Sequence, residues 1–162
     1  EYQNVIDLGC GTGLAGKSLK DISSNLTGID ISKNMVSEAE KLDIYDTLIV
    51  GDIVEKLDAS KDKFDLLVAL DVLIYIGDVQ SIFKAVRKSC KPSSLFVFST
   101  EIQDENGYSL LKSSRYAHSD KYIMYQANEL FDLVNSQNVR LRKEGENWIE
   151  GKVYIFRLGK LG

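Results

Sequence analysis

A short apolar run and a glycine-rich turn meet in the stretch Val5-Ile6-Asp7-Leu8-Gly9-Cys10-Gly11-Thr12-Gly13. The run ends at a carboxylate and a leucine, and a segment with helical spacing follows the glycines. A glycine-rich turn between a buried strand and a helix brings backbone N–H groups and the helix dipole close to a ligand, because no side chains stand in the way. The stretch therefore predicts a ligand-binding loop near the start of the chain.

Length and composition predict one soluble globular domain over residues 1–162. Hydrophobic residues make up 44% of the chain and charged residues 27%, and the formal net charge is -4. This balance lacks the basic footprint of a nucleic-acid-binding protein, and no apolar run approaches the roughly 20 residues that span a bilayer. We therefore expect neither nucleic acid nor a membrane as a partner.

The two cysteines, Cys10 and Cys90, lie far apart and lack metal-ligand spacing. So few cysteines in this arrangement indicate a reduced, cytoplasmic protein without a metal site. The chain begins at Glu1, almost inside its first predicted strand, so we expect that an N-terminal segment of the domain is missing.

Strands and helices alternate through the first hundred residues. We predict strands at residues 4–8, 26–30, 47–50, 64–70 and 95–99, and helices at 14–21, 33–41 and 79–90. Residues 53–57 are expected to form at most a short helix or a turn. Such alternation predicts a parallel sheet with right-handed crossovers and helices on both faces. A long loop is predicted at 102–125 and a helix at 126–137; two strands, at 139–143 and 152–158, are then expected to pair antiparallel at one edge.

Two phosphate-binding motifs overlap in the glycine-rich turn. The residues from Gly11 to Ser18 satisfy the G-x-x-x-x-G-K-S phosphate-loop pattern, with Asp71 as a magnesium-binding residue at the end of an apolar run. The residues from Gly11 to Gly16 also fit the dinucleotide pattern G-x-G-x-x-G, with Asp30 somewhat nearer than expected. Both motifs place their first glycine directly after the strand, whereas here Gly9 takes that position, so the pattern alone leaves the ligand open.

The framing Asp7-Leu8-Gly9-Cys10-Gly11-Thr12-Gly13 resembles the first motif of class I S-adenosylmethionine-dependent methyltransferases of the small-molecule type. The resemblance covers essentially the whole chain. It implies an α/β, Rossmann-like, doubly wound three-layer sandwich, with a seven-stranded, mostly parallel sheet and an antiparallel edge hairpin. Ser93-Ser94 departs from the glycines of many relatives. The further matching stretches are Gly28-Ile29-Asp30-Ile31-Ser32, Gly51-Asp52-Ile53, Phe64-Asp65-Leu66-Leu67 through Asp71, and Lys91-Pro92-Ser93-Ser94-Leu95.

Four carboxylates support the same ligand independently of the resemblance. Asp7, Asp30, Asp52 and Asp71 each lie at the end of an apolar run or within two residues of it. The carboxyl ends of parallel strands share one edge of the sheet, where open α/β folds bind ligands. S-adenosylmethionine is a net cation, which suits an acidic rim, whereas ATP would meet like charge there unless magnesium intervened.

The resemblance implies a role for each residue of the cofactor site. Asp30 should accept hydrogen bonds from both ribose hydroxyls, and Asp52 should bind the adenine amino group. Gly9, Gly11 and Gly13 should let the backbone approach the cofactor, whose product form is S-adenosyl-L-homocysteine. The other cofactor-binding residues implied are Asp7, Cys10, Thr12, Ile31, Met35, Ile53, Leu70 and Asp71.

The expected reaction is methyl transfer to an oxygen or nitrogen of a small-molecule acceptor. His118, the sole histidine, falls in the loop after the fifth strand and is the candidate general base, with a solvated loop histidine as the alternative. Tyr75, Arg115 and Tyr116 are candidate acceptor contacts. Two rival functions remain: a phosphate-loop nucleotide hydrolase that uses Lys17, Ser18 and Asp71, and a non-catalytic S-adenosylmethionine-binding module.

Overall fold

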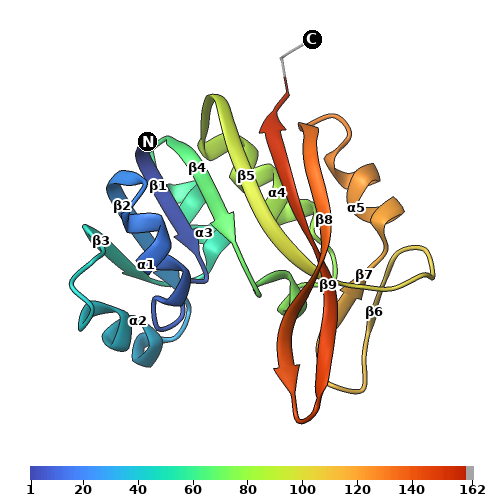
Figure 1. Ribbon diagram of the computed structural model, residues 1–162. Coiled ribbons are helices and arrows are strands. Elements are labelled where there is room, and N and C mark those ends of the chain that lie inside the picture. Colours follow the sequence, from blue (N-terminus) through green and yellow to red (C-terminus); the bar gives the residue numbers. More distant parts are fainter. Residues whose placement is uncertain (160–162) are drawn as a thin grey trace.

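The computed structural model describes residues 1–159, through which one nine-stranded sheet runs (Figure 1). Its parallel part has the order β3-β2-β1-β4-β5, and β9 continues the sheet antiparallel to β5. The predicted mixed sheet, mostly parallel with an antiparallel hairpin, is confirmed. The strands are β1 (Tyr2–Leu8), β2 (Ser23–Asp30), β3 (Thr47–Val50), β4 (Phe64–Ala69), β5 (Cys90–Ile102), β6 (Tyr108–Leu110), β7 (Tyr116–His118), β8 (Phe131–Glu144) and β9 (Asn147–Leu158).

Helices cover both faces of the sheet, as alternating side chains on the central strands require. Val5 on β1 faces α1 (Leu14–Lys20) in a small core, whereas Ile6 and Leu8 face the larger core. The larger core lies beneath α3 (Ile53–Ala59), α4 (Gln80–Ser89) and α5 (Asp120–Ala127). A further helix, α2 (Lys33–Glu40), contacts β2 and β3, and the short 3-10 helix η1 (Leu73–Tyr75) follows β4.

The helix predicted at residues 126–137 is wrong. The helix of this region, α5, begins earlier because the Ser119 hydroxyl caps it by accepting a hydrogen bond from the Tyr122 amide at 3.1 Å. Phe131 already belongs to β8, where it pairs with Leu158 and packs in the larger core. Leu130, Phe131 and Val134 have helical spacing, but pairing with β9 and aromatic packing outweigh that local preference.

The loop predicted at residues 102–125 contains regular structure. The strands β6 and β7 pair antiparallel with each other, and β7 adds to the end of β5. These two three-residue strands account for the difference between the seven strands predicted and the nine observed. The hairpin of β8 and β9 extends well beyond the rest of the sheet (Figure 1).

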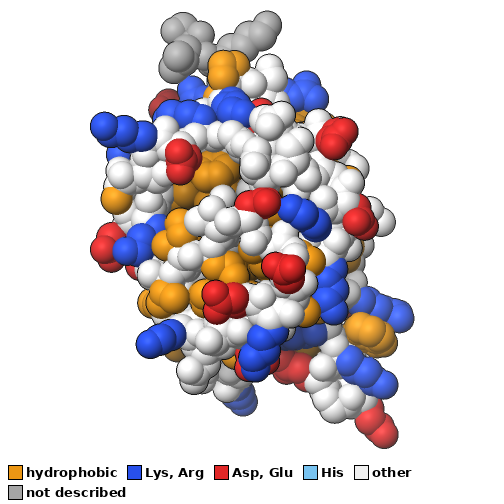
Figure 2. Space-filling model, turned by 90° about the vertical axis from the view of Figure 1, so that its left-hand side faces the viewer, with side chains coloured by type: hydrophobic (Ala, Val, Ile, Leu, Met, Phe, Trp, Pro, Cys, Tyr) orange, Lys and Arg blue, Asp and Glu red, His pale blue; other side chains and the backbone are white. Residues whose placement is uncertain are grey.

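Acidic and basic side chains are interspersed on the face seen in Figure 2, with hydrophobic side chains visible between them. Charges of both signs mixed in this way give no single-sign surface on this face. Among the described residues, no helix is both long enough and apolar enough to cross a membrane.

Candidate functional site

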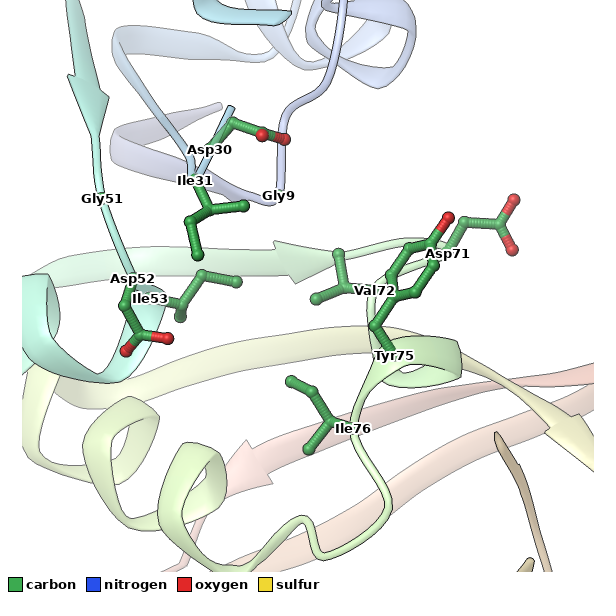
Figure 3. A pocket seen from close by; sticks show the side chains of 10 residues that line it. All are labelled: Gly9, Asp30, Ile31, Gly51, Asp52, Ile53, Asp71, Val72, Tyr75 and Ile76. Atoms are coloured by element: carbon green, nitrogen blue, oxygen red, sulfur yellow. The ribbon is translucent and has the colours of Figure 1, made fainter. Parts of the chain in front are cut away.

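Two adjoining cavities lie at the carboxyl-terminal edge of the parallel strands, and Gly9 and Asp71 line both of them. The first cavity has a volume of about 320 Å³ and the second of about 530 Å³. Besides the two shared residues, the first cavity is lined by Asp30, Ile31, Gly51, Asp52, Ile53, Val72, Tyr75 and Ile76 (Figure 3). The second is further lined by Asp7, Cys10, Gly11, Thr12, Leu14, Ala15, Leu70, Ser99, Val139, Arg140, Leu141 and Val153.

The glycine-rich loop takes a shape that only glycines adopt at low cost. Gly9, Gly11 and Gly13 have φ values of 71°, 53° and 90°, in the left-handed region. A Cβ at Gly9 would also overlap the Val72 side chain. The amides of Gly9 and Cys10 donate to the Ile29 carbonyl at 2.7 and 2.9 Å, which fixes the loop against the end of β2.

Asp30 connects that loop to the start of α2. Its Oδ2 accepts a hydrogen bond from the Gly11 amide at 2.9 Å, and its Oδ1 accepts one from the Ser32 amide at 2.8 Å. Each carboxylate oxygen retains acceptor capacity after one such bond. Asp30 is therefore held in place with lone pairs left for a ligand in the first cavity.

Apolar side chains form the walls of the first cavity. Ile31, Ile53, Val72 and Ile76 point toward one another across it (Figure 3). Asp52 lies at its edge, where Oδ1 caps α3 by accepting from the Glu55 amide at 2.9 Å. The cavity therefore combines a slot for a flat apolar group with carboxylates at its rim.

Asp7 is the buried carboxylate of the site and is one of the residues that line the second cavity. Burial raises its pKa to about 6; the hydrogen bond from the Tyr45 hydroxyl opposes the rise, and the charge of Asp30 adds to it. Burial, with help from both carboxylates, raises the pKa of the Cys10 thiol to about 12. Cys10 is therefore a neutral small residue of the loop rather than a nucleophile.

Asp71 lies two residues beyond the end of β4 in a left-handed conformation, with φ 56°, and its amide donates to the Ser99 hydroxyl at 2.9 Å. Its Oδ1 accepts from Arg142 at 2.9 Å, and Arg142 also pairs with the buried Glu101 and with Glu144. This ionic cluster joins the β8–β9 hairpin to the end of β4. The sequence pattern does not indicate this cluster, because its members are far apart in the chain.

The structure brings together most of the predicted cofactor residues. Eleven of the thirteen line one of the two cavities, and the exceptions are Gly13 and Met35. Val72 and Ile76 also line the first cavity but are not among the predicted residues, although they begin and end the apolar stretch 72–76 that follows Asp71. Nothing in the sequence pattern indicated the hairpin residues of the second cavity, since their place depends on how β8 pairs with β9.

His118 lies in β7 and is neither a general base at the cavities nor a solvated loop histidine, so both predictions for it are corrected. Its side chain is fully buried, and Nε2 is 2.9 Å from the carbonyl oxygens of both Ile76 and Gly77, so this nitrogen donates to them. Burial lowers its pKa, with the two carbonyls opposing the change. The residue therefore stays neutral and supports the Ile76 wall of the first cavity from outside.

Of the three candidate acceptor contacts, one lines a cavity and two do not. Tyr75 is exposed and lines the first cavity, so its contact with an acceptor stays a prediction. Arg115 instead forms an ion pair with Glu144, and Tyr116 packs edge-on against Tyr108 at 6.0 Å between ring centres. Neither Arg115 nor Tyr116 is among the residues that line the two cavities.

The fold and this edge define an α/β domain built to hold a ligand with an apolar ring and positive charge. The chain belongs to the methyltransferase domain family, whose pattern matches residues 6–98, from β1 into β5.

Three known proteins illustrate the relationship. The ubiquinone biosynthesis O-methyltransferase of Hydrogenovibrio crunogenus is 28% identical over 117 residues, which cover 68% of this chain and 47% of that protein. The 18S rRNA (guanine-N(7))-methyltransferase of Bos taurus is 33% identical over 94 residues, covering 57% of this chain and 34% of the relative. The chain therefore spans half or less of these curated relatives.

A solved structure shares the fold over almost the whole chain. The N-methyltransferase NodS of Bradyrhizobium japonicum, in complex with S-adenosyl-L-homocysteine, superimposes with a TM-score of 0.77 at 18% identity. The match covers 98% of this chain and 79% of that one.

Proposed function

We propose that this chain is an S-adenosylmethionine-dependent methyltransferase that acts on an oxygen or nitrogen of a small-molecule acceptor. The observation that carries the proposal is the pair of adjoining cavities, which share Gly9 and Asp71 and have carboxylates at their rims. Membership of the methyltransferase domain family supports it.

The residues present fit the cofactor. Asp30 would bind the ribose hydroxyls with its remaining lone pairs, and the apolar walls of the first cavity would enclose the adenine ring. Asp52 would accept from the adenine amino group at the cavity edge. The glycine-rich loop and Asp7 would face the amino-acid part, whose ammonium is attracted by the buried carboxylate. When bound, the cofactor supplies a methyl group already activated by the sulfonium.

The chain's contribution to transfer is alignment and exclusion of water rather than proton removal. Neither cavity is lined by a histidine, and His118 is buried with Nε2 engaged. In-line displacement on an activated carbon gains most from placing the acceptor correctly in a dry site. Val139, Leu141 and Val153 give the second cavity an apolar wall that suits the body of a small acceptor. The names of the ubiquinone O-methyltransferase and of NodS support oxygen and nitrogen acceptors.

Calorimetric titration with S-adenosylhomocysteine tests the cofactor assignment. Asp30→Ala removes an acceptor for two ribose hydroxyls, so we expect a loss of affinity of about 100-fold, from about 3 kcal/mol of charged hydrogen bonds. Lys17→Ala is the matched control. Lys17 is exposed on α1 and lines neither cavity, so the affinity should stay within about twofold of wild type.

Two results would contradict the proposal. One is unchanged affinity in Asp30→Ala; the other is magnesium-dependent ATP binding that Lys17→Ala abolishes, which would favour the phosphate-loop hydrolase. Turnover with a panel of phenols, catechols and primary amines then separates an enzyme from a binding module. Formation of S-adenosylhomocysteine with at least one acceptor supports the enzyme, and tight cofactor binding without turnover on any of them supports the module.

A further inference from the structure

The buried Asp7 and the half-buried Tyr45 form a pair that the sequence motifs do not account for. Asp7 is 2% exposed, and the Tyr45 hydroxyl donates to its Oδ2 at 2.7 Å. The two residues are 38 positions apart, so the bond exists only in the folded chain. A carboxylate this deeply buried is stable in its charged form only where a donor compensates it.

The ring of Tyr45 occupies space that three glycines leave open. A Cβ at Gly16 would overlap the Tyr45 hydroxyl, and one at Gly28 would lie 2.9 Å from ring atom Cε1. A Cβ at Gly13 would lie 3.2 Å from Cε2. Alanine at Gly16 or Gly28 would therefore push the ring away from Asp7, and alanine at Gly13 would crowd it.

The segment that carries Tyr45 is itself anchored. The Asp46 amide donates to the Leu26 carbonyl at 2.9 Å, and Asp46 Oδ2 accepts from the Leu26 amide at 2.7 Å. The same oxygen pairs with Lys20 at 3.0 Å. The chain before β3 is thus tied to β2 and α1, which fixes where the Tyr45 side chain enters.

We propose that Tyr45 is a positioning residue of the cofactor site, whose hydroxyl keeps the Asp7 carboxylate charged and oriented beneath the glycine-rich loop. The inference rests on the proposed function, because the ammonium of the cofactor is the group that the charge of Asp7 attracts. Asp30 and the Cys10 thiol are the titratable groups that face Asp7 from β2 and from the loop, and Asp71 lines the same cavity. The charge of Asp30 opposes the ionisation of Asp7, whereas the hydrogen bond from Tyr45 favours it.

The pair can be tested without the cofactor. Carbon-13 NMR titration of the Asp7 carboxyl in the unliganded protein should give a midpoint near the pKa of about 6. In Tyr45→Phe, which keeps the ring and removes the hydroxyl, we expect this midpoint to rise by about 1 to 2 pH units. Tyr2→Phe is the matched control: Tyr2 lies on the same strand as Asp7 and borders the same small core as Tyr45. Its substitution should leave the midpoint unchanged.

If Tyr45 keeps Asp7 charged, Tyr45→Phe should also shift the pH dependence of cofactor affinity. The affinity of the wild type for S-adenosylhomocysteine should fall as the pH drops through the Asp7 midpoint, by about tenfold per pH unit. In Tyr45→Phe the fall should begin at a pH higher by the same shift as the NMR midpoint. A purely structural role for Tyr45 would lower affinity equally at every pH and overturn the inference. An unmoved Asp7 midpoint in Tyr45→Phe would also overturn it.

Gly16→Ala provides a second variant if Tyr45→Phe does not fold. Its Cβ displaces the hydroxyl, so the Asp7 midpoint should rise in the same direction. The experiments distinguish a failure of the proposed function from a failure of the Tyr45 inference. If wild type does not bind S-adenosylhomocysteine, the proposed function is wrong, while the NMR titration still decides whether Tyr45 keeps Asp7 charged.

Discussion

Replacing Asp7 with asparagine is expected to change how folding stability depends on pH. Burial raises the pKa of Asp7 from 3.8 to about 6, so the folded protein keeps a proton that the unfolded chain has already released. As the pH rises from about 4 to above 6, wild type therefore loses about 3 kcal/mol, since each pKa unit corresponds to about 1.4 kcal/mol. The asparagine side chain carries no such proton, so Asp7→Asn should gain about 3 kcal/mol relative to wild type over this range and no more above it.

Urea unfolding of the cofactor-free proteins between about pH 4 and 8 measures this difference. The asparagine amide has its own burial cost, but that cost is the same at every pH and leaves the slope unaffected. His118 acts with the opposite sign, since burial lowers its pKa and stability is lost as the pH falls below 6.5; this contribution is common to both proteins and cancels. Asp104→Asn, at an exposed position, controls for the loss of one negative charge. Parallel stability curves for wild type and Asp7→Asn would refute the reasoning.

Two further predictions concern buried groups beside the cavities. His118→Leu leaves the carbonyls of Ile76 and Gly77 without their donor, so the free energy of unfolding in urea should fall by about 1 to 3 kcal/mol. A loss of turnover at saturating cofactor with unchanged stability would instead support His118 as a base. Arg142→Met leaves the buried Glu101 without its cation and should cost about 3 to 5 kcal/mol. Adding Glu101→Gln should recover part of this cost, and a double variant no more stable than Arg142→Met would argue against the pairing.

The cofactor edge could be predicted from sequence because its determinants are local. The apolar runs in the sequence predict β1, β2 and β4. The residues that line the cavities lie near or just beyond the ends of these strands, namely Asp7 and Gly9 for β1, Asp30 for β2, and Leu70 and Asp71 for β4. Once alternation with helices indicated a parallel sheet, the strand ends had to share one edge. Asp30 and Asp71 were found in this way without knowledge of any long-range contact.

The second cavity could not be predicted in the same way. Its far wall comes from β8 and β9, and β8 was interpreted as a helix over much of its length. Residues 132–138 are mostly polar and exposed at the sheet edge, so they show neither the alternation of a half-buried strand nor a continuous apolar run. Pairing with β9 decides their conformation, and a single sequence carries little information about that pairing.

Gly16 shows why a sequence can match the phosphate-loop motif without binding a phosphate. In the G-x-x-x-x-G-K-S pattern this glycine would serve a phosphate, yet here its missing Cβ makes room for the Tyr45 hydroxyl, which reaches Asp7. A glycine required for close packing and one required for close approach of a ligand look identical in sequence, because both demand only the absence of a side chain. What separates them is the neighbour that fills the space. In this chain the neighbour is a tyrosine that keeps a buried carboxylate charged, an arrangement suited to a cationic ligand and opposed to a phosphate.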